Sequence, residues 1–287
     1  MKGTISMSSA TVTSTRYLKV PGGRLAYDDT GTGPLVVCLP GLGDLRASYR
    51  FLAPRLVAAG YRVVTMDLRG LGESSTGWAD YHVTSVAGDL LALLHALDAG
   101  PAFLVGNSFT GGAVAYVAAT TPAAVAGVML LDAFVRDTPQ TLVQRAGGWL
   151  LPHLGVGAWA MYFKTLYPSA PPADFAAYLA ALKANLKEPG RWAATVGMVR
   201  SGQSAVEPLL GDVRAPTLVV VGGKDPDFTD PAGEARTIAA QLRGAARVQV
   251  AVIEGAGHYP HAELPEQTAP VVVDFLQSVR GEDEHGA

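Results

Sequence analysis

Short apolar runs alternate along most of the chain with segments of helical pattern, and this alternation constrains the fold more than any other feature. The runs are rich in valine and leucine and apolar at almost every position, which is typical of strands covered on both faces by helices. They lie at residues 34–40, 61–67, 102–107, 125–132, 216–223 and 246–255. The helical segments lie around residues 48–59, 83–98, 111–120, 234–243 and 265–280. This order predicts an α/β fold with a mostly parallel central sheet, right-handed crossovers and flanking helices.

Two parts of the chain depart from this pattern. The segments TSTRYLKV and GRLAYDD flank Pro-Gly-Gly and alternate in polarity, which predicts an antiparallel hairpin at the sheet edge. Residues 134–211 contain several helical patches, many aromatic residues and no clear strand, which predicts an inserted helical cap. The remaining expected divisions are a core at 16–133 and 212–280, a flexible N-terminal segment at 1–15 and a flexible acidic tail at 281–287.

The composition excludes several classes of protein. The chain has 287 residues, of which 49% are hydrophobic and 16% charged, so it can bury a sizeable core and is not disordered as a whole. Its net charge is -3 and it has no Lys/Arg cluster, so nucleic acid and anionic membranes are not expected partners. It shows neither a signal-peptide pattern nor a run of about 18 apolar residues, which predicts a cytoplasmic protein without membrane insertion. Oligomeric state stays open.

Ser108 lies where an apolar strand turns abruptly into a helix, in the stretch LVGNSFTGG. Glycines suit a backbone this tight, and the N-terminus of the following helix favours a developing negative charge. The stretch resembles the nucleophile elbow of the α/β-hydrolase family, whose pattern is Gly-x-Ser-x-Gly. This chain reads Gly106-Asn107-Ser108-Phe109-Thr110, so Thr110 departs from the pattern and a modest adjustment of the turn is expected.

Two more segments continue the resemblance in the order of the family. His258, on a glycine-rich loop after the last apolar run, matches the catalytic histidine, with His261 as its rival. Asp225, just past a strand end, matches the acid that orients the histidine, and Asp227 and Asp132 are alternatives. A serine hydroxyl needs such a base within hydrogen-bond reach. The two histidines have no accompanying carboxylate or thiol set, so no metal site is expected.

The resemblance also implies an oxyanion hole. Its donors would be the backbone N–H groups of Leu42, in LPGLGDL, and of Phe109, directly after the serine. The segment VVTMDLRGLGESS resembles the family's Asp-x-Arg-Gly-x-Gly-x-Ser loop. We assign Asp67, Arg69 and Ser74 in this segment to loop architecture rather than to catalysis.

The function implied by this resemblance is acyl transfer to water. The expected substrate is a small to medium, largely apolar carboxylic ester, thioester or lactone, cleaved through an acyl-enzyme at Ser108 without a cofactor. A serine at this position excludes the usual dehalogenase and epoxide hydrolase branches, which attack with an aspartate. Cofactor-free perhydrolysis, hydrolysis of a C–C bond and a non-catalytic ligand receptor are alternatives. Candidates for an apolar pocket are Trp149, Trp159, Tyr162 and Phe163.

Overall fold

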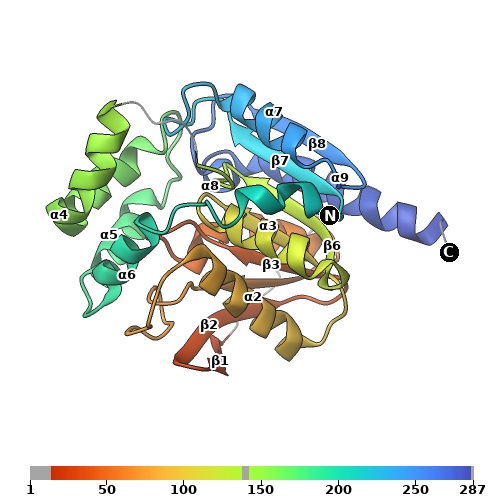
Figure 1. The fold of residues 1–287 in the computed structure, drawn as a ribbon, viewed down its shortest axis with the longest axis horizontal. Helices are drawn as coiled ribbons and strands as arrows, with labels where there is room; N and C mark the ends of the chain where they lie inside the picture. Colours follow the sequence, from red (N-terminus) through yellow and green to blue (C-terminus); the bar gives the residue numbers. More distant parts are fainter. Residues whose placement is uncertain (1–13, 138–141, 286–287) are drawn as a thin grey trace, which may run out of the picture.

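The computed structural model describes residues 14–137 and 142–285, with side chains over 14–137 and 153–281. Its strands are β1 (Arg16–Val20), β2 (Gly23–Thr30), β3 (Leu35–Leu39), β4 (Arg62–Met66), β5 (Ala102–Asn107), β6 (Val125–Leu131), β7 (Thr217–Gly222) and β8 (Val248–Ile253). They form one eight-stranded sheet in the order β1-β2-β4-β3-β5-β6-β7-β8 (Figure 1). β2 pairs antiparallel with β1 and β4, and the other neighbours are parallel. The mostly parallel sheet and its edge hairpin are therefore confirmed.

Helices cover both faces of the sheet. They are α1 (Leu52–Ala58), α2 (Val83–Leu97), α3 (Thr110–Thr120), α7 (Pro231–Gln241), α8 (Pro260–Glu263) and α9 (Pro265–His285). Apolar residues of α1 and α9 pack with one side of β3, and those of α2, α3 and α7 belong to the cluster that includes its other side. β3 is buried at every position, as expected for a strand between two helical layers. Its Cys38 is fully buried, and burial raises the pKa of the thiol.

The segment between β6 and β7, which we call the helical insertion, is largely helical in its described residues. It holds α4 (Leu142–Thr165), α5 (Phe175–Leu186) and α6 (Arg191–Val199), with no strand among its described residues. Figure 1 shows these helices grouped beside one end of the sheet. α4 is interrupted at Gly155, whose φ of 75° lies in the left-handed region that favours glycine. Among the described helices, none combines the length and the hydropathy that a membrane-spanning helix requires.

Flexible segments were predicted at both ends of the chain, and the structure describes most of only the C-terminal one. Residues 1–13 of the predicted N-terminal segment lie outside the described residues. At the other end, α9 continues to His285, so most of the predicted flexible tail is helical. Glutamate has a high helix propensity, and Glu282 and Glu284 allow the helix to extend past the buried core.

Candidate active site

Ser108 occupies a strained turn between β5 and α3. Its φ is 56°, a left-handed conformation that costs an L-residue roughly 1–2 kcal/mol. Its N–H donates to the Leu131 carbonyl at 2.9 Å, and its carbonyl accepts from the N–H of Phe134 at 2.9 Å. A Cβ atom on Gly106 would lie 2.5 Å from the Thr110 carbonyl oxygen, so the close approach of β5 to α3 requires glycine. Backbone contacts on both sides therefore fix the turn.

Thr110 fits where the family pattern has glycine. It is the first residue of α3 and is fully buried. Its hydroxyl lies 3.0 Å from the Leu39 carbonyl and 2.9 Å from the Asn107 carbonyl. The threonine therefore ties the start of α3 to the ends of β3 and β5.

The loop after β7 and the loop after β8 bring an acid and a histidine together. Nδ1 of His258 lies 2.7 Å from Oδ2 of Asp225, and both side chains are buried. The other Asp225 oxygen accepts the N–H of Asp227 at 2.9 Å. The Asn107 amide, next to Ser108, donates to the His258 carbonyl at 3.2 Å. The histidine loop is thus bonded to the acid loop on one side and to the elbow on the other.

The Ser108 and His258 residues share Phe134 as a neighbour. The Phe134 N–H bonds the Ser108 carbonyl, and its ring centroid lies 5.9 Å from that of the His258 imidazole. Within the described ranges, no hydrogen bond joins the Ser108 hydroxyl to His258. Such bonds are often long in enzymes without substrate and tighten in the complex. The pairing of serine and histidine stays a prediction.

Three carboxyl groups set the electrostatics of His258. Burial alone lowers the pKa of its imidazole, but Asp225, Asp227 and Asp132 raise that pKa to about 10. Burial, followed by the neighbouring charge of Asp225, raises the pKa of Asp132 well above its usual range. Its Oδ1 accepts the Gly222 N–H at 2.8 Å. Asp225 is therefore the carboxylate in direct contact with Nδ1, and Asp227 lies farther away, with Oδ2 at 3.7 Å.

The same cluster offers atoms that could coordinate a metal ion. Ligand atoms of Asp132, Asp225 and His258 all lie within 4.8 Å of one another. However, Nδ1 of His258 and Oδ2 of Asp225 face each other at hydrogen-bond distance, with room for a proton between them. A metal ion would have to displace that proton. The arrangement fits a hydrogen-bonded acid–imidazole pair better than a preformed metal site.

The predicted oxyanion donors lie on the two loops that meet at Ser108. Phe109 precedes the first residue of α3, and Leu42 follows β3. A Cβ atom on Gly41 would lie 3.2 Å from Cβ of Ser108, so the loop after β3 closely approaches the elbow. Among the described residues, neither the Leu42 nor the Phe109 N–H has a hydrogen-bond acceptor. Their role as oxyanion donors stays a prediction.

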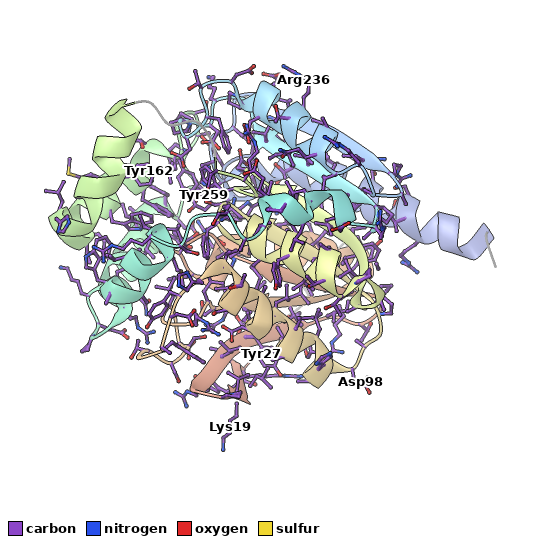
Figure 2. The ribbon with its side chains drawn as sticks, in the orientation of Figure 1. Lys19, Tyr27, Asp98, Tyr162, Arg236 and Tyr259 are labelled. Atoms are coloured by element: carbon purple, nitrogen blue, oxygen red, sulfur yellow. The ribbon has the colours of Figure 1, made fainter. Side chains whose placement is uncertain are left out.

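The aromatic pocket candidates have different surroundings. Trp159 is buried and its Nε1 donates to the Gly43 carbonyl at 3.1 Å, next to the predicted oxyanion loop. The Tyr162 hydroxyl bonds Asp227, and Figure 2 labels this tyrosine on the helical insertion. Phe163 is fully buried in a cluster of aromatic rings that includes Tyr259, which points to core packing. The side chain of Trp149 lies outside the described residues.

His261, the rival histidine, is held in a different environment. It lies in α8, fully buried, and stacks on Tyr49 with ring centroids 4.6 Å apart. Neither ring nitrogen has a hydrogen-bond partner among the described residues. Burial, followed by the charges of Arg50 and His258, lowers the pKa of His261 to about 3. A histidine with so low a pKa and no acid partner is too weak a base for this role.

Two residues that support the site were not predicted from the sequence. Asn107 ties the elbow to the histidine loop, as described above. Glu263 accepts the Gly257 N–H at 2.6 Å and the Ser169 N–H at 2.8 Å, so it joins the histidine loop to the helical insertion. Its sequence signal is weak, because a glutamate at the end of a short helix is usually exposed. Here it is buried.

The residues assigned to loop architecture make structural contacts. Arg69 forms a bidentate pair with Asp89, at 2.7 and 2.8 Å. The Ser74 hydroxyl donates to the Asp67 carbonyl and accepts the Ala26 N–H, both at 2.9 Å. These bonds connect the loop after β4 to α2 and β2.

A model of the alpha/beta hydrolase family matches residues 36–271. The chain belongs to this family. BpoC of Mycobacterium tuberculosis, named as a non-heme bromoperoxidase, is 44% identical over 85 residues, which are 29% of this chain and 32% of BpoC. The chain thus spans about a third or less of the first curated relatives it matches.

Solved structures are similar over nearly the whole chain. A thermophilic esterase from Thermogutta terrifontis is 28% identical with a TM-score of 0.73, covering 93% of this chain and 99% of the esterase. A bromoperoxidase from Bacillus anthracis is 23% identical with a TM-score of 0.79, covering 92% of this chain and 100% of its own. These similarities agree with the α/β-hydrolase fold.

Proposed function

We propose that this member of the family is a serine hydrolase that cleaves small to medium, largely apolar carboxylic esters. The observation that carries the proposal is the 2.7 Å contact between Nδ1 of His258 and Asp225. This contact fixes the imidazole so that Nδ1 holds a proton and Nε2 is the basic nitrogen. The strained elbow that bears Ser108 is bonded to the same histidine loop through Asn107.

Acylation begins at the Ser108 hydroxyl. Its oxygen attacks the ester carbonyl carbon while Nε2 of His258 accepts the hydroxyl proton. The N–H groups of Leu42 and Phe109 donate to the oxyanion of the tetrahedral intermediate, and Asp225 stabilises the imidazolium. The intermediate then breaks its bond to the alkoxy oxygen. His258 gives that oxygen its proton, so an alcohol leaves and an acyl-serine remains.

Deacylation repeats these steps with water. His258 accepts a proton from water as the water oxygen attacks the acyl carbon. The second tetrahedral intermediate breaks its bond to the Ser108 oxygen, which regains a proton from His258. The carboxylic acid leaves, and the serine and the imidazole return to their starting states.

The surroundings of the site favour an apolar acyl or alkyl group. Phe134, next to His258, packs against Phe228 with ring centroids 5.1 Å apart. Trp159 lies against the predicted oxyanion loop, from a helical insertion that we assign as the cap over this site. Substrate pockets are usually lined by such residues around a few polar groups. The similarity to the Thermogutta esterase, at 28% identity, also supports an ester.

A fluorophosphonate probe tests the proposal directly. It should label the wild-type protein, at a rate that rises as the pH approaches the His258 pKa of about 10, and Ser108→Ala should abolish the labelling. The exposed Ser169 provides the control, because Ser169→Ala should label like the wild type. His258→Ala should lose nearly all turnover of a p-nitrophenyl ester. A folded protein that is never labelled and cleaves no ester in a panel of graded chain length would support the ligand-receptor alternative instead.

Perhydrolysis is the second candidate, and the relationship to BpoC favours it. Hydrogen peroxide would take the place of water in deacylation and release a peracid from the acyl-serine. Both reactions use the same residues. They differ in the molecule that attacks the acyl-serine, which is water in hydrolysis and hydrogen peroxide in perhydrolysis. Formation of peracid from an ester and peroxide, at a rate above that of hydrolysis, would favour this reaction.

A further inference from the structure

The helical insertion reaches the acid–histidine pair through Tyr162. This residue lies on α4, and its hydroxyl is 2.7 Å from each carboxylate oxygen of Asp227. Burial, followed by the charge of Asp227, raises the pKa of Tyr162 well above its usual value. The hydroxyl therefore keeps its proton and donates a hydrogen bond to the Asp227 carboxylate. Oδ2 of Asp227 in turn lies 3.7 Å from Nδ1 of His258. A hydrogen bond from the insertion thus ends on a carboxylate beside the imidazole.

We propose that Tyr162 is a positioning residue that holds Asp227 as a second carboxylate beside His258, so that the seating of α4 sets the strength of the base. The inference rests on the proposed function. It differs from a pocket role for Tyr162 and from the role of Asp227 as the acid in place of Asp225, which are the roles considered from the sequence. Tyr162 would act on the reaction through Asp227 and His258 without touching the substrate.

Other contacts of the insertion fix the position of α4 relative to the loops of the site. Trp159, one turn before Tyr162, bonds the Gly43 carbonyl and packs on Tyr162 with ring centroids 5.5 Å apart. Leu166, just after α4, accepts the His258 N–H at 3.0 Å. The helix is therefore bonded to the loop after β3, to the acid loop and to the histidine loop. A shift of α4 along its axis would alter all of these contacts together.

The charges around the imidazole define the direction of the effect. The titratable groups facing or adjoining His258 are Asp225, Asp227, Asp132, Tyr162, Tyr259 and His261. Burial lowers the pKa of His258 and the carboxylates raise it. Burial raises the pKa of Asp227, as does Asp225, whereas His258 and the Tyr162 hydrogen bond lower it. Removing the hydroxyl releases Asp227 from its position beside the imidazole, and a carboxylate charge that lies farther away raises the pKa of His258 less.

The pH profile of kcat/KM tests this coupling. The rise of kcat/KM with pH follows deprotonation of His258, so Tyr162→Phe and Asp227→Asn should both move that rise to lower pH, by about one unit or tenfold in proton affinity. The double variant should move it no further than Asp227→Asn alone, because both changes act on one carboxylate. Tyr178→Phe is the matched control. It removes a hydroxyl of the same insertion that bonds Asp44 instead, and it should leave the position of the rise unchanged.

Titration of the His258 ring by NMR provides a readout that does not need turnover. The ring should titrate at lower pH in Tyr162→Phe than in the wild type, and at the wild-type pH in Tyr178→Phe. An unchanged titration in Tyr162→Phe, or an equal shift in Tyr178→Phe, would overturn the inference. Additive shifts in the double variant would do the same. Failure of the proposed function looks different, because the wild type would then be neither labelled at Ser108 nor active on esters.

Discussion

Replacing Gly106 by alanine tests whether steric contact fixes the nucleophile. The added Cβ would lie 2.5 Å from the carbonyl oxygen of Thr110 and 2.8 Å from the N atom of Gly111, where ordinary contacts begin at 3.4 Å. These atoms belong to the backbone of the first turn of α3 and cannot rotate away. Either β5 or α3 must move, and the Ser108 residue between them must move as well.

The expected size of the effect follows from this overlap. Relieving the shortest contact requires a displacement of close to 1 Å, and a misplacement of ~1 Å at a reacting group costs ~100-fold in rate. Overpacking of this kind costs about 1–3 kcal/mol of stability, with the upper end expected where the contacts are to backbone. At roughly 2–4 °C per kcal/mol, the melting temperature should fall by several degrees.

The assay compares Gly106→Ala with a matched glycine in a helix. Gly88 in α2 is exposed, and a Cβ there would have nothing within 4 Å, so Gly88→Ala should stabilise the protein by about 0.5–1 kcal/mol. The rate of fluorophosphonate labelling and kcat/KM on a p-nitrophenyl ester measure the position of the serine. Scanning calorimetry measures stability. If Gly106→Ala reacts and melts like the wild type, the turn is not held by these contacts and the reasoning is wrong.

The remaining predictions concern other parts of the site. Thr110→Val should lower the free energy of unfolding in urea by about 1–3 kcal/mol, because the buried carbonyls of Asn107 and Leu39 lose the hydroxyl that they share, and Thr110→Ser should retain most of the stability. His261 has a folded-state pKa of about 3, below its ordinary value, so its contribution to stability is complete above pH ~6.5 and lost as pH falls toward 3. His261→Phe should therefore weaken the loss of stability between pH 7 and 4.5, and an unchanged loss would contradict this. Asp225→Asn should lower kcat/KM by up to ~10⁴-fold and Asp132→Asn far less, while a larger loss in Asp132→Asn would identify Asp132 as the acid.

The sheet could be predicted because most of its strands are buried on both faces. Their apolar character is nearly continuous, so the runs stand out wherever they occur. The predicted ends of strands and helices were less accurate. The run at 246–255 contains a shorter strand, β8, which lies at the sheet edge and is only partly buried. The helix expected at 48–59 begins as a 3-10 turn (Arg46–Tyr49), and the α-helix follows with Pro54 in its first turn, where the missing N–H costs nothing.

The sequence predicted which loops carry the residues of the candidate site, but not the hydrogen bonds that connect these loops to one another. Strand ends place a serine, an acid and a histidine at one edge of a parallel sheet, so their location at the same edge follows from topology. The choice of the acid among Asp225, Asp227 and Asp132 does not follow from topology. All three lie near the imidazole, and only their distances from it distinguish them. The bonds from Asn107 to the His258 carbonyl and from Tyr162 to Asp227 depend on how distant segments dock, which periodicity does not encode.

The distribution of strain offers an independent argument for the location of the site. In the described part of the chain, Asp98, Ser108 and Asp132 are the non-glycine residues with positive φ. Ser108 and Asp132 follow the neighbouring strands β5 and β6, and a buried oxygen of Asp132 also lacks a hydrogen-bond partner among the described residues. Each feature costs stability, and the fully buried strands beside it offset the cost. A chain selected for stability alone would relax such positions, so their grouping indicates function. At the elbow Thr110 departs from the family's motif while the strained backbone of Ser108 is present, so the backbone conformation supports the proposed nucleophile where the sequence motif is incomplete.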